Sequence, residues 1–524
     1  MPTRAMKRLN TIGALAVLVF AVVLLGLLWL HGNRLLFSSD EGIFLDGAER
    51  MLHGQALYRD FFACMGPGSF GLQLAAFRVF GLTMWAGRVV VIFDFALQCA
   101  LVFWLTARLA GRRAAWGTLA LFFAFRASMP LLLAAHHRMD GAALSLASIA
   151  LCIEGRERRK AWYWVVAGIP IAGAAACTPS LALFAPATLV WLLAVKPLRR
   201  FAIPYLCGVC AGSAAIAAAL AATGSLLPCI RQMIWLQHTY STINVVPYGS
   251  VIGGYRAAFG AATAAGHGVA GALALFCFAL PAALPLAALL AWGLSLSLNR
   301  AERRWAADNA IPYLLGCTVL YVVTAFPRAD LMHLAYVAAV PSALMAAWIV
   351  RYAPRLLVAC VFGFLAVWAG IFLAQAASGM GNEVSVATPV GTLRVEASEA
   401  PAVDALLKTV HPGDSLYVHF IMPDFYFLTQ GDNPTLYSEL VPGMMGGGEE
   451  TAALSALDRS PPAWVLYYPM PRADFLRVFP NATHIDHRFS AIEAWILREY
   501  TPVEPPLIVR YYQLYQRRTA PGRR

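Results

Sequence analysis

Residues 11–30, TIGALAVLVFAVVLLGLLWL, and the SSDEG motif that follows at 38–42 decide the fold of this 524-residue chain. The first stretch has about 20 residues, enough to cross a bilayer core that is about 30 Å thick. Basic residues precede it, and it is longer than the apolar part of a cleaved signal peptide, so we predict a retained membrane span. Asp40 and Glu41 must then lie in the headgroup region or in a wet cavity, because charge buried in lipid is costly.

The composition extends this prediction to most of the chain. Hydrophobic residues make up 60% and charged residues 13%, with a mean hydropathy of +0.63, whereas soluble domains carry about 25% charged residues. The formal net charge of +12 comes largely from arginine clusters between apolar runs, where positive residues set the orientation of membrane helices. We therefore predict a polytopic α-helical membrane protein that binds the lipid bilayer and no nucleic acid.

Eleven apolar runs are candidates for membrane-spanning helices. They cover residues 11–30, 83–107, 114–133, 140–154, 161–177, 180–195, 201–222, 268–297, 308–326, 334–350 and 356–376. The runs 140–154 and 180–195 are short for a span. The stretch 66–80 is equally short, and we expect an interfacial helix there, because one more crossing would scramble the charges of the loops.

The loop charges orient these spans. If the N-terminus is cytoplasmic, every strongly basic short loop falls on the cytoplasmic side. These loops hold Arg108, Arg112 and Arg113; Arg156, Arg158, Arg159 and Lys160; Lys196, Arg199 and Arg200; Arg300, Arg303 and Arg304; and Arg351 and Arg355. We predict a multi-pass inner-membrane protein with a membrane domain at 1–376, whose first outer loop is 31–82. Residues 377–524 alternate strand-like and helical stretches, so we expect a small periplasmic α/β domain there.

Three polar clusters from distant parts of the sequence fall on the predicted outer face. The first holds Asp40, Glu41, Tyr58, Arg59 and Asp60, the second His136, His137, Arg138 and Asp140, and the third Arg328, Asp330 and His333. Each cluster alone could cap a helix, anchor a span end or form a structural ion pair. Together, at span ends where charges are expensive against lipid, they favour one shared cavity. A further polar stretch that includes Asp424 and Tyr426 is more typical of a surface loop.

Such a set of side chains can perform only a few kinds of chemistry. A carboxylate can act as general base toward a hydroxyl group, arginines can hold a phosphate group, and histidines can share protons. The sequence has no glycine-rich nucleotide loop, and the site faces away from cytoplasmic nucleotides. We therefore expect a lipid-linked phosphate as the activated donor. No metal-ligand set and no cofactor besides this donor is predicted, and a divalent metal stays open.

The first outer loop carries a family resemblance. The segments DEGIF at 40–44, AERMLHGQ at 48–55, YRDF at 58–61, GPGS at 66–69 and FRVFG at 77–81 follow one another in order. This run resembles the first outer loop of bacterial GT-C glycosyltransferases, and it is similar to protein O-mannosyltransferases and lipid A aminoarabinose transferases. The resemblance covers the predicted membrane domain, residues 1–376.

The resemblance implies an inverting transfer of one sugar from a polyprenyl-phosphate donor to a hydroxyl group of a glycan, lipid or protein acceptor. It assigns the general base to Asp40, with Glu41 beside it, and a second acid to Asp140. The remaining candidates for contacts to the donor phosphate or the substrates are Tyr58, Arg59, Asp60, His137, Arg138, Arg328, Asp330 and His333.

One position departs from the family pattern. Aminoarabinose transferases usually carry a lysine before the proline of the first loop, whereas Gly66 precedes Pro67 here. A phosphate contact is therefore missing, and Arg59 or Arg328 would have to supply it. The tryptophan-rich motif of oligosaccharyltransferases is also absent, which argues against transfer of a whole glycan to asparagine.

The alternative function is a transporter or flippase for a charged or lipid-linked solute. Transporters place ionisable residues near the bilayer midplane and often contain internal repeats. Here the predicted spans are nearly free of charge in their interiors apart from Asp94, and the sequence shows no repeat. A plain membrane anchor for the C-terminal domain ranks last, because eleven spans exceed what an anchor needs.

Overall fold

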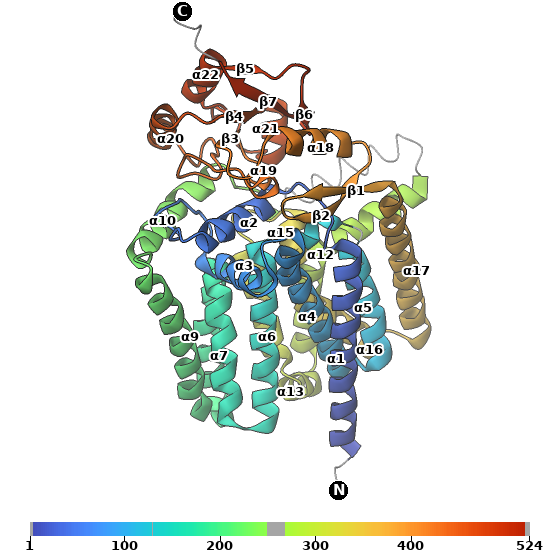
Figure 1. The fold of residues 1–524 in the computed structure, drawn as a ribbon. Helices are drawn as coiled ribbons and strands as arrows, with labels where there is room; N and C mark the ends of the chain where they lie inside the picture. Colours follow the sequence, from blue (N-terminus) through green and yellow to red (C-terminus); the bar gives the residue numbers. More distant parts are fainter. Residues whose placement is uncertain (1–3, 128, 249–267, 519–524) are drawn as a thin grey trace, which may run out of the picture.

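A computed structural model describes residues 4–127, 129–248 and 268–518 of the chain. A bundle of long helices carries a cap at one end (Figure 1). The cap is formed by the strands and short helices of residues 383–518. The long helices are α1 (Arg4–His31), α4 (Met84–Ala110), α5 (Arg112–Ala127), α6 (His137–Arg158), α7 (Ala161–Cys177), α8 (Phe184–Ala194), α9 (Ala202–Ala222), α12 (Gly268–Leu298), α14 (Ile311–Thr324), α16 (Ala339–Tyr352) and α17 (Arg355–Gly379). Each of the eleven apolar runs predicted from the sequence overlaps one of these helices.

Not all of these helices are long enough to span a bilayer alone. Four helical stretches of the described residues are both long and apolar enough, namely Asn10–His31, Met84–Ala110, Lys196–Ala222 and Arg355–Ala374. A fifth candidate is the bent pair α13 (Arg300–Asp308) and α14, whose axes meet at 80°. The structure therefore confirms a helical protein with several apolar helices, and the number of eleven spans stays a prediction.

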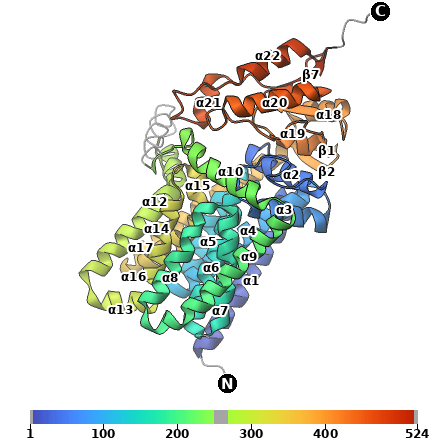
Figure 2. The ribbon, with the colours of Figure 1, turned by 90° about the vertical axis from the view of Figure 1, so that its left-hand side faces the viewer.

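Short helices gather at the end of the bundle that carries the cap. They include α2 (Ser39–Leu52), α3 (Pro67–Phe80), η1 (Pro130–Leu133), η2 (Pro179–Leu183), α10 (Leu226–Thr239), η4 (Tyr240–Thr242) and α15 (Leu331–Tyr336). Both views show α2, α3, α10 and α15 near the cap, and α13 near the N-terminus at the far end (Figures 1 and 2). The stretch 66–80 thus forms a helix, α3, that lies beside α2 at the bundle end.

The C-terminal region is an α/β structure, as the sequence predicts. A hairpin of β1 (Glu383–Thr388) and β2 (Gly391–Glu396) follows α17 and η5 (Met380–Asn382). The main sheet has the order β3-β4-β7-β5, with β6 paired to β7, and only β3 and β4 run parallel. Its strands are β3 (Leu416–His419), β4 (Trp464–Tyr467), β5 (Tyr500–Pro502), β6 (Ile508–Val509) and β7 (Tyr512–Arg517), and its helices are α18 (Ala400–Thr409), α19 (Asp424–Thr429), α20 (Gly447–Arg459), α21 (Arg472–Val478) and α22 (Ser490–Glu499).

The cap and the first outer loop share one hydrophobic core. Phe77 of α3 stacks on Phe427 of α19 with ring centroids 5.6 Å apart, and Phe37 packs on Phe425 at 5.4 Å. Main-chain hydrogen bonds join the same regions, since the Met84 amide donates to the Val390 carbonyl at 3.0 Å. The predicted boundary at 376/377 falls inside α17, and residues on both sides of it pack into this core.

Candidate active site

A cavity of about 200 Å³ lies where the bundle meets the cap. Both the bundle end and the cap contribute polar side chains to its lining. These are Ser39, Asp40, His136, His137, Tyr240, Asn244, Arg328, Asp330, His333 and Glu439. Its apolar lining includes Met65 from the first outer loop and Val441, Met444 and Phe479 from the cap. The structure thus brings members of all three sequence clusters to one cavity.

Asp40 presents a free carboxylate to this cavity. Helix α2 has Ser38 as its N-cap, so Asp40 falls in the first turn, where the helix dipole favours negative charge. Its side chain is 45% exposed, and its Oδ2 lies 3.5 Å from Nε2 of His136. The alternative that Asp40 serves as the N-cap of α2 is therefore wrong, and its carboxylate is accessible to a substrate.

Glu41 has a different environment from its neighbour. Its side chain is 1% exposed and forms a two-pronged ion pair with Arg88, which is fully buried. Its Oε1 also accepts a hydrogen bond from the Ala135 amide at 3.1 Å. Adjacent residues of a helix point in directions about 100° apart, so only one of the two acids faces the cavity. Glu41 fixes the turn that presents Asp40.

The cap holds the same turn from the other side. Oδ1 of Asp424 accepts a hydrogen bond from the Ser38 amide at 3.1 Å, and Ser438 donates one to Asp46. A Cβ atom on Gly42 would lie 2.3 Å from the Asp424 nitrogen, so this close approach requires glycine. Asp424 and Tyr426 are 4% and 1% exposed, so the expectation that they belong to a surface loop is wrong.

Two stacked histidines form one wall of the cavity. The His136 ring lies between His137, at 4.8 Å, and Tyr336, at 4.9 Å. Burial lowers the pKa of His136 to about 4, although the Asp40 carboxylate opposes this change. Burial also lowers the pKa of His137, whose Nδ1 lies 2.9 Å from the Thr178 hydroxyl. Both rings are therefore neutral near pH 7 and act as hydrogen-bonding groups rather than as cations.

Arg328 supplies the positive charge of the cavity. Its Nε donates to Asp330 at 2.7 Å, its Nη1 to Asn244 at 2.9 Å and its Nη2 to the Val478 carbonyl at 3.0 Å. A guanidinium has five N–H groups, so two remain for a ligand beyond these three bonds. The position of the side chain is thus fixed while part of its donor capacity is open.

Asp330 orders the segment next to Arg328. Its Oδ1 caps α15 by accepting from the His333 amide at 3.0 Å, and it lies 2.6 Å from Nδ1 of the same residue. Burial alone would raise the pKa of Asp330, but the hydrogen bonds and charges of His333 and Arg328 outweigh it and hold the pKa below its usual range. Asp330 therefore stays ionised and acts as an anchor for Arg328.

Asp140 and Arg138 do not line this cavity. Asp140 is 2% exposed and lies beside Asp94 and Ser69 inside the bundle. Arg138 is buried, donates to the Thr324 carbonyl at 3.2 Å and lines a separate small pocket. The sequence predicts both residues on the face of Asp40, but neither side chain lines its cavity, although Arg138 reaches Tyr240 of the lining.

The Tyr58–Asp60 turn also lies apart from the cavity lining. The Tyr58 hydroxyl donates to the Met65 carbonyl at 2.6 Å, and Arg59 pairs with Asp60 at 2.8 Å. Arg59 also donates to the Thr223 carbonyl at 3.0 Å, which ties the loop to the end of α9. Hydrogen bonds from Arg59, together with its positive charge, lower the pKa of Asp60 to about 2. These residues hold the first outer loop in shape, and Arg59 is not placed to replace the missing lysine.

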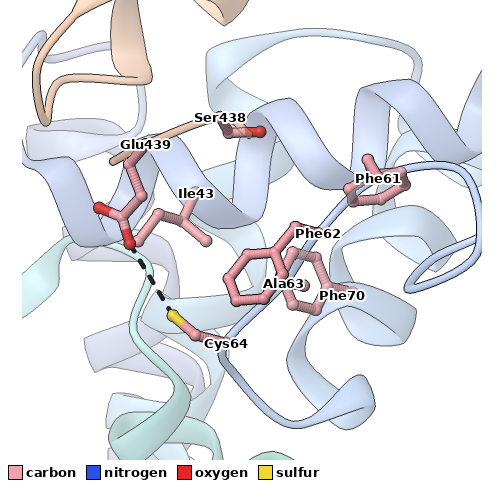
Figure 3. Close-up of a pocket in the computed structure, with 8 residues that line it drawn as sticks. All are labelled: Ile43, Phe61, Phe62, Ala63, Cys64, Phe70, Ser438 and Glu439. Carbon is pink, nitrogen blue, oxygen red and sulfur yellow. Dashed lines mark hydrogen bonds between the residues drawn. The ribbon is translucent and has the colours of Figure 1, made fainter. Parts of the chain in front are cut away.

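The sequence analysis missed Glu439, which the cap contributes to the cavity. Its side chain extends from the loop between α19 and α20 toward Cys64, with Oε1 3.8 Å from the cysteine Sγ (Figure 3). Ile43, Phe62 and Phe70 line a small apolar pocket on the same side, together with Cys64. No local pattern distinguishes Glu439 from the other acids of the cap, so only the fold brings it near Asp40.

Within residues 4–127, 129–248 and 268–518, no group of three or more histidine, cysteine, aspartate or glutamate side chains has the arrangement of a metal site. Within the cavity, Arg328 is paired with Asp330.

The comparisons with known proteins follow this geometry. No protein-family model matches the chain, and no curated protein sequence is significantly similar to it. ArnT from Cupriavidus metallidurans, solved bound to undecaprenyl phosphate, shares 13% identity over 97% of each chain with a TM-score of 0.43. The Archaeoglobus fulgidus oligosaccharyltransferase, solved tethered with an acceptor peptide, shares 13% identity over 88% of this chain and 69% of its own, with a TM-score of 0.49.

Both matches have sequence identities of 13% and TM-scores below 0.5. At this level of identity and overlap, the function has to be argued from the residues of the cavity.

Proposed function

We propose that this protein is an integral-membrane glycosyltransferase that uses Asp40 as general base. The observation that carries the proposal is the junction cavity, in which an accessible carboxylate and an arginine with spare N–H groups line the same space. A base and a phosphate-binding group are the two functions that sugar transfer from a lipid phosphate requires. The resemblance of the first outer loop supports the same reaction.

In the proposed reaction Asp40 removes the proton from an acceptor hydroxyl. The acceptor oxygen then forms a bond to the anomeric carbon of the sugar, and the bond between that carbon and the phosphate oxygen breaks. The bond electrons leave with the polyprenyl phosphate, and the proton stays on Asp40 until water removes it. Attack opposite to the leaving group inverts the anomeric centre, which requires one base and no covalent enzyme intermediate.

Arg328 is the proposed contact for the donor phosphate. Asp330, Asn244 and the Val478 carbonyl hold its guanidinium in place, so little side-chain entropy is lost when it binds a ligand. Its two remaining N–H groups fit two oxygens of a phosphate, which is the geometry that guanidinium recognises best. His137 and His333 line the cavity as additional hydrogen-bonding groups for the sugar or the acceptor.

The transporter alternative is less well supported. The cavity opens at the junction with the cap, and its charged residues belong to short helices and loops at one end of the bundle. A transport site would be expected near the middle of the spans. Among the described charged residues, the deeper Asp94 and Asp140 contact each other and line no cavity with Arg328.

An assay of sugar transfer tests the proposal. Purified protein is reconstituted with radiolabelled polyprenyl-phosphate sugars, and wild type is compared with Asp40→Asn. Loss of the general base should lower the rate about 10²–10⁴-fold. Asp404→Asn is a matched control, because Asp404 lies on the surface of α18 and pairs only with Lys408. Equal transfer or release of sugar by wild type and Asp40→Asn would eliminate the proposed base.

A further inference from the structure

We propose that Glu439, supplied by the cap, is a substrate-positioning residue that works as an uncharged carboxylic acid and donates a hydrogen bond to a substrate oxygen beside Asp40. The inference rests on the proposed function and adds a group that neither the sequence nor the resemblance assigns. Glu439 of the cap and Asp40 of α2 line the same cavity. The site would then need both the first outer loop and the cap.

The position of Glu439 leaves its carboxyl group available to a ligand. Its one described hydrogen bond is the weak 3.8 Å contact with the Cys64 thiol. In contrast, two acids of α2 have strong partners. Glu41 forms an ion pair with Arg88, and Asp46 accepts a hydrogen bond from Ser438. The Glu439 side chain runs along Ile43 at the edge of an apolar pocket (Figure 3). Glu439 therefore lacks the hydrogen-bond partners expected of a carboxyl group with a purely structural role.

The surroundings of Glu439 also disfavour its charged form. Burial raises the pKa of Glu439 to about 8, and the negative charge of Asp40 adds to the increase. The titratable and charged groups that line the cavity with it are Asp40, Cys64, His136, His137, Tyr240, Arg328, Asp330 and His333. Of these, Arg328 pairs with Asp330, and Asp40 is the charged group that acts on Glu439 among the described residues. Its carboxyl group is therefore mostly protonated at pH 7.

A protonated carboxyl group complements the neighbouring base. A general base accepts hydrogen bonds through its carboxylate oxygens, whereas a neutral acid has one O–H donor. A sugar hydroxyl or phosphate oxygen that lies between them can therefore donate toward Asp40 or accept from Glu439. A neutral donor also avoids a second negative charge next to an anionic donor lipid. Other enzymes also contain two acids whose different environments give them different pKa values and therefore different roles.

Steady-state kinetics of three variants test this role. Glu439→Gln keeps a neutral donor of nearly the same shape, so its kcat/KM at pH 7 should stay within about threefold of wild type. Glu439→Ala removes the hydrogen bond and should lose roughly tenfold, with KM affected more than kcat. The substrate whose KM rises identifies the bound oxygen as that of the donor or of the acceptor. Equal losses for the Gln and Ala variants would overturn the inference.

The pH profile separates this role from a structural one. In wild type, kcat/KM should fall as the pH rises through about 8, because Glu439 ionises and stops donating. Glu439→Gln cannot ionise, so this alkaline decrease should disappear. A Gln variant that keeps the decrease would contradict the inference, whatever its activity at pH 7.

An infrared titration provides a readout that does not depend on sugar transfer. Around pH 8, wild type should lose the C=O absorption of one more protonated carboxylic acid than Glu439→Gln does. Glu49→Gln is the control, because Glu49 has a raised pKa of about 9 and lies outside the cavity. If wild type transfers no sugar but shows this difference, the proposed function fails while the protonated Glu439 stands. If the two spectra change alike, the inference itself fails.

Discussion

The two adjacent acids of α2 show how one helical turn separates two roles. Asp40 faces a solvent-accessible cavity, and Glu41, the next residue, is buried against Arg88. A buried ion pair contributes little relative to apolar residues of the same shape, but removing one partner leaves an uncompensated charge. The Glu41 and Arg88 pair is therefore best tested by breaking it and by replacing it.

Glu41→Gln should lower the free energy of unfolding by about 3–5 kcal/mol, because Arg88 then stays buried without an anion. The double variant Glu41→Leu with Arg88→Met removes both charges and should lose much less. Thermal melting of the purified protein measures both effects. Glu302→Gln breaks a more exposed pair with Arg351 and should cost at most about 1 kcal/mol. Similar melting temperatures for Glu41→Gln and Glu302→Gln would contradict a structural role for the buried pair.

The contact between α2 and α19 positions the turn that carries Asp40. Asp424 of α19 accepts from the backbone at the start of α2, and Gly42 allows the two backbones to approach. A helical glycine usually costs about 0.5–1 kcal/mol relative to alanine. Gly42 is kept in spite of that cost because any larger residue would meet the Asp424 backbone.

Gly42→Ala should lower both the melting temperature and the rate of sugar transfer, because its Cβ would lie 2.3 Å from the Asp424 nitrogen. Gly71→Ala in α3 is the matched control, since a Cβ there meets nothing within 4 Å. The control should be neutral or slightly stabilising. Melting and transfer assays on both variants decide the matter, and identical behaviour would show that α2 and α19 do not need this close contact.

Hydropathy predicted the elements better than it predicted the site. Apolar runs are a local property, so each of the eleven runs contains a long helix, and the strand-like stretches at 416–420 and 464–468 form β3 and β4. The cavity depends on the direction of side chains and on long-range contacts. Asp140 and Arg138 share the predicted face with Asp40 but point elsewhere. Glu439 has no neighbouring pattern that reveals its place, because the fold alone brings the cap to the first outer loop.

A second group of buried acids lies where the bundle meets the cap. Glu49 and Asp46 of α2 are 8% and 4% exposed, and Asp432 of the cap lies near Glu49. Burial and the charge of Asp46 raise the pKa of Glu49 to about 9, although Gln430 and Arg50 oppose this change. Burial likewise raises the pKa of Asp46. The junction is therefore sensitive to deprotonation.

The contribution of Glu49 to the stability of the wild type should decrease as the pH rises from about 4.5 to about 9. Above pH 4.5 the unfolded Glu49 loses its proton while the folded one keeps it, so each pH unit costs up to about 1.4 kcal/mol from this residue. Glu49→Gln removes that dependence, and melting temperatures across this pH range should fall less steeply than in wild type. Asp404→Asn, at an exposed pair, should leave the profile unchanged. Parallel profiles for Glu49→Gln and wild type would contradict the raised pKa.

The shared core between the first outer loop and the cap has a consequence for biosynthesis. Ser38, two residues before Asp40, and Asp424 are 386 residues apart in the sequence, so the ribosome makes Asp40 long before the cap residues that complete its surroundings. The apolar helices between them can insert in order while the cavity still lacks the side chains of the cap. The cavity around Asp40 is therefore complete only after the cap has folded onto the first outer loop.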